Sequence, residues 1–169
     1  TDGGMFIADV WFSGQSRLQI GYRPSDSTVA QTIAPEGDSV CDRLEDGSEV
    51  CLVPSGPHPL NGAYEVQAFF TVPPPGGRWL LTVHNPGPQP ARVDAWAVVD
   101  GTAWSSGVER SMRVAMPGTA REAITVGAYT TRAGWTGLDG EVYGTGAQVG
   151  GLAPFSSDGP TRDQRFKPE

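Results

Sequence analysis

The side chains in this sequence that could do chemistry are few and lie far apart. Nucleophilic catalysis by a serine needs a histidine that takes its proton and a carboxylate that orients the histidine. The two histidines are His58, which stands between two prolines, and His84, which ends a predicted strand. No G-x-S-x-G pattern supplies a nucleophile. The sequence therefore predicts no catalytic residue, and each histidine is interpreted as solvated or structural.

The two cysteines are separated by a polar loop that contains a glycine. Cys41 and Cys51 have a spacing that suits a disulfide closing a short hairpin, and the alternative is a pair of free thiols. Metal binding would need further cysteine or histidine ligands nearby. The disulfide is the favoured interpretation, and it implies an oxidising compartment.

Acidic residues gather in and around the same loop. A solvated run of charge is the favoured interpretation, and the alternative is a calcium site, because carboxylate oxygens are ligands that calcium prefers. The residues are Asp38, Asp42, Glu45, Asp46 and Glu49. Calcium is therefore the one cofactor that these acidic residues suggest.

Composition and periodicity predict a mainly β protein. The 169 residues include 23 glycines and 15 prolines, which separate short apolar runs. Strands are predicted over 5–12, 17–23, 28–33, 49–53, 63–72, 78–84 and 91–99, the first two as a hairpin. Residues 54–59 are predicted to be irregular because of their prolines. This pattern is typical of an antiparallel β-sandwich or jelly roll. The net charge of −7 argues against nucleic acid as a partner, and no apolar run predicts a membrane span.

Two stretches near the C-terminus carry a resemblance to a known family. They read P-G-T-A-R-E-A-I-T-V-G-A-Y from Pro117 to Tyr129, and F-S-S-D-G-P-T-R-D from Phe155 to Asp163, followed by Lys167-Pro168. This order resembles part of a subtilisin-like serine protease. Asp158 stands where that family usually has arginine, and Gln164 where it usually has glycine. Upstream, G-R-W-L-L-T-V at 77–83 and V-D-A-W at 93–96 are similar to the jelly-roll modules inserted in some of these enzymes.

The resemblance implies an internal portion of a larger enzyme. We expect a jelly-roll-like insert domain at 1–107 and an incomplete piece of the subtilisin-like α/β domain at 108–169, with one helical turn over 118–123 and a strand over 124–130. It also implies that Ala115 lies at a substrate pocket, that Met116 and Pro117 join it in the pocket wall through a cis bond, and that carbonyls of 118–123 are a candidate calcium or sodium site.

The catalytic triad of such a parent maps to no position in this chain, so the chain alone is predicted to be inactive. The implied function is that of a non-catalytic portion of a secreted, extracellular serine endopeptidase. Its partners would be the remainder of the parent protease and the peptide substrate of the parent. The alternative is a β-sandwich binding module for carbohydrate or protein, since exposed tryptophans can form carbohydrate-binding platforms. Its candidates are Trp11, Trp79, Trp96, Trp104 and Trp135.

Overall fold

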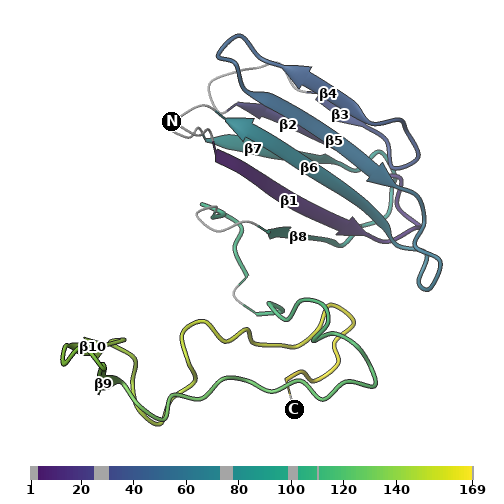
Figure 1. The fold of residues 1–169 in the computed structure, drawn as a ribbon. Coiled ribbons are helices and arrows are strands. Elements are labelled where there is room, and N and C mark those ends of the chain that lie inside the picture. The colour runs from purple at the N-terminus through teal and green to yellow at the C-terminus, as the bar shows by residue number, and fades with distance from the viewer. Residues whose placement is uncertain (1–3, 25–30, 73–77, 99–102, 110, 169) are drawn as a thin grey trace. The chain divides into compact units, whose positions relative to one another are not determined.

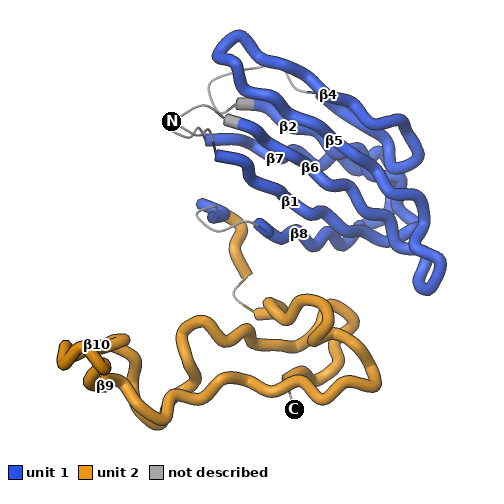
Figure 2. Tube along the Cα trace, in the orientation of Figure 1, with its two compact units in different colours: residues 1–105 blue, residues 106–169 orange. Residues whose placement is uncertain are grey.

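The chain folds into two compact units. The computed structural model describes residues 4–24, 31–72, 78–98, 103–109 and 111–168. Internal contacts divide the chain into residues 1–105 and residues 106–169 (Figure 2). We call the first the two-sheet unit and the second the C-terminal unit.

The two-sheet unit is built from antiparallel strands (Figure 1). One sheet has the order β4-β5-β6-β1-β8 and the other the order β3-β2-β7. The strands are β1 (Gly4–Phe12), β2 (Gln19–Pro24), β3 (Gln31–Ile33), β4 (Val40–Arg43), β5 (Glu49–Ser55), β6 (Tyr64–Val72), β7 (Trp79–His84) and β8 (Val93–Ala97). The mainly β, antiparallel fold class is thus confirmed. Residues 28–30 of the predicted third strand lie outside the described residues.

The inward faces of both sheets meet in one hydrophobic core. Val10 and Phe12 of β1 are fully buried, as is Ile20 of β2, and all belong to the same cluster of packed side chains. Burying each such side chain contributes about 1.5–3 kcal/mol. Because side chains alternate along a strand, Asp9 and Trp11 of β1 point to the outer face of their sheet. The alternation that predicted these strands therefore sets which residues reach the core.

The predicted hairpin between 5–12 and 17–23 is wrong. β1 pairs with β6 and β8, whereas β2 pairs with β3 and β7. The Ser13–Ser16 turn, closed by the Ser16 amide donating to the Ser13 carbonyl at 3.0 Å, carries the chain from one sheet to the other. Both strands have a complete apolar face, and placing them in opposing sheets buries the two faces against each other.

The β5 strand extends further than the sequence predicted. It continues through Pro54 to Ser55, both expected to be irregular, and Pro54 lies opposite Val66 of β6. On its other side the pairing with β4 ends at the pair Val40–Leu52. Because proline lacks the amide that a ladder needs, it is tolerated where one side of the strand has no partner.

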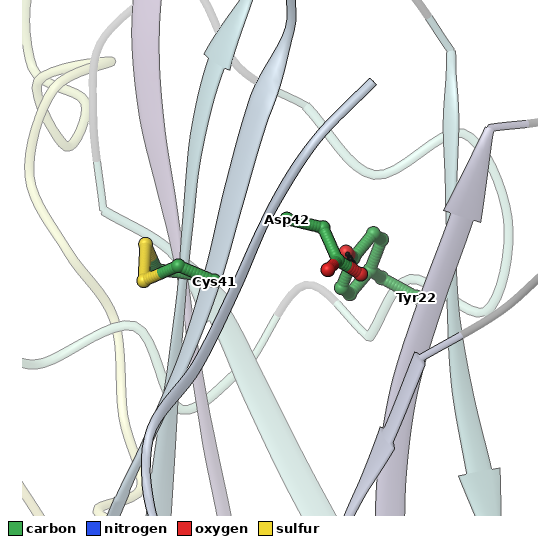
Figure 3. Close-up of a disulfide and its surroundings, with 4 residues drawn as sticks. Tyr22, Cys41 and Asp42 are labelled. Atoms are coloured by element: carbon green, nitrogen blue, oxygen red, sulfur yellow. Dashed lines mark hydrogen bonds between the residues drawn. A yellow bond between two sulfur atoms is a disulfide. The ribbon is translucent and has the colours of Figure 1, made fainter. Parts of the chain in front are cut away.

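The cysteine hairpin connects the two sheets. Cys41 of β4 and Cys51 of β5 lie directly opposite each other, with Cα atoms 4.0 Å apart, and form a disulfide (Figure 3). The neighbouring Asp42 accepts a hydrogen bond from the Tyr22 hydroxyl of β2, at 2.8 Å between Oη and Oδ2. Burial, followed by this bond to a carboxylate, raises the pKa of Tyr22. The link therefore ties the five-stranded sheet to the three-stranded sheet.

The C-terminal unit contains little regular structure. Its described residues hold β9 (Gly134–Thr136) and β10 (Val142–Gly144), which pair as an antiparallel hairpin. The helical turn predicted over 118–123 is wrong, because this stretch forms turns instead. The strand predicted over 124–130 is also wrong: its pairing is limited to a bridge between Tyr129 and Leu152. The described residues form no helix, and therefore none that could span a membrane.

Candidate functional site

A hollow of about 300 Å³ lies in the C-terminal unit. Its lining comes from the stretch 114–128 and from the tail 155–168, and most of the lining side chains are apolar or small. The lining residues are Val114, Ala115, Gly118, Thr125, Val126, Ala128, Phe155, Ser156, Ser157 and Pro168. Such a hollow can receive an apolar or small group, but it holds no acid, base or histidine.

The structure brings one of the three predicted pocket residues to this hollow. Ala115 is part of the lining, whereas Met116 and Pro117 are not. The Met116 side chain is 88% exposed. The Met116–Pro117 peptide bond is cis, as the resemblance implied. Of these three residues, Ala115 is therefore the one that lines the hollow.

The turn after Pro117 is tightly packed against the hollow. The Ala120 amide donates to the Pro117 carbonyl at 3.0 Å, and the Thr125 hydroxyl donates to the Gly118 carbonyl at 2.7 Å. A Cβ on Gly118 would lie 3.0 Å from the Val114 side chain and 3.1 Å from the Thr125 methyl group. Only a residue without a side chain fits here without displacing these neighbours.

The tail is held to this turn by a polar network. The Thr161 hydroxyl donates to Asp163 Oδ1 at 2.6 Å, and Arg165 Nε donates to Asp163 Oδ2 at 2.7 Å. Hydrogen bonds from Arg165 and then from Thr161 lower the pKa of Asp163 to about 2. Arg165 Nη2 also donates to the Thr119 carbonyl at 2.7 Å, and Lys167 Nζ donates to the Ala123 carbonyl. The sequence assigned Arg165 no role and Lys167 only a place in the family motif, because their hydrogen-bond partners lie 46 and 44 residues away.

Both departures from the family pattern have a structural counterpart. Asp158 forms an ion pair with Arg113, at 2.7 Å between Oδ1 and Nε, and the hydrogen bond from Arg113 lowers the pKa of Asp158. Gln164 has a φ of 63°, in the left-handed region that glycine adopts at the least cost. A glycine preference at this position thus has a backbone explanation, and the chain tolerates glutamine there.

The two histidines belong to the two-sheet unit. His58 Nδ1 accepts a hydrogen bond from the Leu60 amide at 3.4 Å, and its ring lies 6.0 Å from the Trp11 ring. His84 ends β7 opposite Gln19. Neither is shown bonded to a serine hydroxyl, so the described geometry gives neither the role of a general base.

Two of the five candidate calcium ligands of the acidic loop accept hydrogen bonds from other groups of the chain. Asp42 is bonded to Tyr22, and Asp46 Oδ1 accepts the Ser48 amide at 2.8 Å within the turn between β4 and β5. Across the described parts of the chain, no group of three or more His, Cys, Asp or Glu side chains is placed to hold a metal ion.

An acidic pair that the sequence did not predict lies on the outer face of the five-stranded sheet. Glu65 of β6 shares a hydrogen bond with Asp9 of β1. Its Oε1 also accepts Gln67 Nε2 at 3.0 Å. Burial, followed by the bond and the charge of Asp9, raises the pKa of Glu65 to about 7. The β1–β6 register, with Trp11 opposite Glu65, creates this proximity and could not be read from the sequence alone.

The comparisons with known proteins point to one family. The model of the subtilase family, of the S8 peptidases, matches residues 92–169. No curated protein matches the chain. Among solved structures, the CspB protease of Clostridium perfringens is similar, with a TM-score of 0.66 at 15% sequence identity. The match covers 96% of this chain and 32% of that structure, so the chain spans about a third of its length.

The structural likeness concerns the fold, since the sequence identity is low. It extends over nearly the whole chain and so includes the two-sheet unit as well as the C-terminal unit. The family match begins just before β8 and runs through the hollow, the turn after Pro117 and the polar network of the tail. The chain therefore carries a subtilase-related segment over residues 92–169.

Proposed function

We propose that this chain is a non-catalytic portion of a secreted subtilisin-like serine endopeptidase. In this proposal the two-sheet unit is a jelly-roll-like insert, and residues 108–169 belong to the catalytic domain. The family match over 92–169 and the structural likeness to a subtilisin-like protease support it. The disulfide between Cys41 and Cys51 supports secretion, because such bonds persist in oxidising compartments.

The observation that carries the proposal is the apolar surface around the hollow. Val126 and Phe155, which line the hollow, are exposed by 81% and 83%. Ile124, which precedes the lining residue Thr125 in sequence, is exposed by 86%. Large apolar side chains gathered in this way indicate a surface that is covered by another part of a protein. The partner we propose is the remainder of the parent catalytic domain, which would bring the triad to a peptide substrate. The acidic net charge of −7 argues against a nucleic acid as the partner.

Ala115 is the proposed substrate-binding residue, while Met116 and Pro117 lie outside the lining of the hollow. In the parent enzyme, Ala115→Phe would fill part of the hollow and change the preference for the substrate side chain that enters it. Met116→Leu is the matched control, because Met116 does not line the hollow. We expect Ala115→Phe to lower kcat/KM for large side chains more than for small ones. An equal loss for both, or an equal effect of Met116→Leu, would contradict the assignment.

The alternative of a binding module draws support from one side chain. Trp135 is 45% exposed and stacks on Tyr143, with ring centroids 5.9 Å apart. Trp79 and Trp104, in contrast, pack against the core. The division of the chain into two units supports the protease portion, since a single binding sandwich would incorporate the tail. A saturable change in tryptophan fluorescence with a soluble polysaccharide would favour the binding module instead.

The sequence that adjoins this chain in its gene tests the proposal. A G-T-S-x-x-x-P-like motif some tens of residues beyond Glu169 would supply the nucleophile, and the catalytic Asp and His are expected ahead of Thr1. An adjoining sequence without these motifs would overturn the peptidase assignment.

A further inference from the structure

Four backbone carbonyls of residues 117–123, which we call the 117–123 turn, accept hydrogen bonds. The donors are the Ala120 amide to Pro117, Thr125 Oγ1 to Gly118, Arg165 Nη2 to Thr119 and Lys167 Nζ to Ala123. Two of these four donors are cationic side chains, and both come from the tail.

Burial and contacts within the tail orient the two cationic side chains toward the turn. Lys167 is 5% exposed, and a buried ammonium is stable only where oxygen atoms surround it. Its backbone passes so close to Gly159 that a Cβ there would lie 1.7 Å from the Lys167 carbonyl oxygen. Arg165 is oriented by Asp163, at 2.7 Å between Nε and Oδ2. Both cations therefore have a defined position.

This arrangement does not fit the metal ion that the family resemblance implies for the turn. Calcium takes about six to eight oxygen ligands, and carbonyls are its main neutral ones in proteins. Here the Gly118 carbonyl already accepts a hydrogen bond from Thr125. The Thr119 and Ala123 carbonyls accept hydrogen bonds from Arg165 and Lys167, in that order. A metal ion at the Ala123 carbonyl would lie within a few ångströms of the Lys167 ammonium and be repelled by it. The described residues also offer no cluster of carboxylates there.

We propose that the side chains of Lys167 and Arg165 take the place of a bound metal ion at the 117–123 turn. By donating to the carbonyls of this turn, they fix the wall of the hollow without lining it. They act as positioning residues, since neither lines the hollow. The proposal concerns this chain's own side chains, and it holds whether or not the chain belongs to a peptidase. It follows that the turn takes no calcium or sodium while Lys167 is present, and that removing the Lys167 side chain creates a place for a cation.

The test is a cation titration of the full 169-residue chain, followed by NMR of the backbone. Amide and carbonyl resonances of residues 118–124 are recorded while calcium chloride, sodium chloride or tetramethylammonium chloride is added. For the wild type, we expect no saturable shift beyond that caused by tetramethylammonium chloride. For Lys167→Ala, we expect a saturable shift with calcium or sodium, centred on the Ala123 carbonyl. Lys167→Arg keeps a cation and should behave as the wild type.

Each arm of the test has an outcome that contradicts the proposal. A saturable calcium or sodium shift at 118–124 in the wild type would overturn it without any variant. Lys167→Ala with unchanged carbonyl resonances and no cation response would show that the ammonium does not fix the turn. If Lys167→Ala loses the dispersed resonances of the turn, the proposal requires that calcium or sodium restore them, and failure to do so contradicts it.

Discussion

The acidic pair on the outer face of the five-stranded sheet makes the stability of the two-sheet unit depend on pH. The pKa of Glu65 is raised from 4.5 to about 7 by burial and by the neighbouring Asp9 carboxyl. One Asp9 carboxylate oxygen is buried, with no hydrogen-bond partner among the described residues. The folded state therefore keeps a proton on Glu65 that the unfolded chain releases. This contribution to stability is complete below pH 4.5 and is lost as the pH rises through about 7.

The size of the effect follows from the shift. A rise from 4.5 to about 7 corresponds to at most about 3.5 kcal/mol, at about 1.4 kcal/mol for each pKa unit. Because the pair lies on the outer face of the sheet and is partly in contact with water, screening lowers our expectation to about 1–2 kcal/mol. Nearby groups that face the pair are Gln67 of β6 and Trp96 of β8, while Asp94 of β8 is neutralised by Arg92 at 3.0 Å.

The perturbation is Glu65→Gln, which keeps the shape of the side chain and removes its charge. Urea unfolding is followed by tryptophan fluorescence near pH 5 and near pH 8. The variant should match the wild type near pH 5 and exceed it near pH 8 by about 1–2 kcal/mol in the free energy of unfolding. A carbon-detected NMR titration of the Glu65 carboxyl should show a midpoint near pH 7.

The matched control is Glu45→Gln, which removes one charge from an exposed position in the turn after β4. It should leave the difference between the two pH values unchanged. Measurements stay above about pH 5 because carboxylates with lowered pKa, such as Asp163, lose their stabilising contacts in acid. Identical pH dependence of Glu65→Gln and the wild type would refute the reasoning.

Three further changes test the contacts that hold the two units. Tyr22→Phe removes the hydrogen bond to Asp42 between the sheets and should cost about 1.5 kcal/mol in urea unfolding, since the acceptor is charged. Cys41→Ser with Cys51→Ser opens a bridge of sequence separation 10 and should cost about 2–3 kcal/mol. Gly159→Ala places a Cβ 1.7 Å from a backbone oxygen, so the C-terminal unit should lose its NMR dispersion while the two-sheet unit keeps its own.

Each of these has a control in the same unit. Tyr64→Phe removes an exposed bond to Glu36 and should change stability by less than about 0.5 kcal/mol, and a loss equal to that of Tyr22→Phe would count against the inter-sheet link. Adding a thiol reductant should destabilise the wild type alone, and not the double serine variant. Gly144→Ala meets its nearest atom at 3.7 Å and should fold normally, so loss of structure in both glycine variants would remove the steric argument.

Alternation in the sequence predicted the strands and their faces but not their partners. Alternate apolar residues of β1 and β2, such as Val10, Phe12 and Ile20, form the core. Alternation is the same whether a strand pairs with its neighbour in sequence or faces it across the core, which is why the hairpin prediction failed. The register that brings Asp9 to Glu65 depends on β1 pairing with β6, about 55 residues later in the chain.

The candidate site was predictable only where the resemblance supplied it. Ala115, which the resemblance places at a substrate pocket, lines the hollow, and its substrate-binding role stays a prediction. The strand predicted over 124–130 had the right residues for a sheet, but a ladder needs neighbouring strands, and Ile124 and Val126 remain exposed. Asp163, Arg165 and Lys167 form a network where the tail meets the turn after Pro117, which lies more than 40 residues earlier in the chain. A contact between stretches so far apart leaves no local sequence pattern.

A fluorophosphonate probe, which reacts with activated serines, tests most directly whether this chain is a non-catalytic portion of a serine endopeptidase. The probe is added to the full-length gene product. We expect the full-length protein to be labelled at a serine outside residues 1–169 and to cleave peptides, while the 169-residue chain alone is neither labelled nor active. A folded full-length protein that takes no label, or a repurified chain of residues 1–169 that hydrolyses peptides, would contradict it.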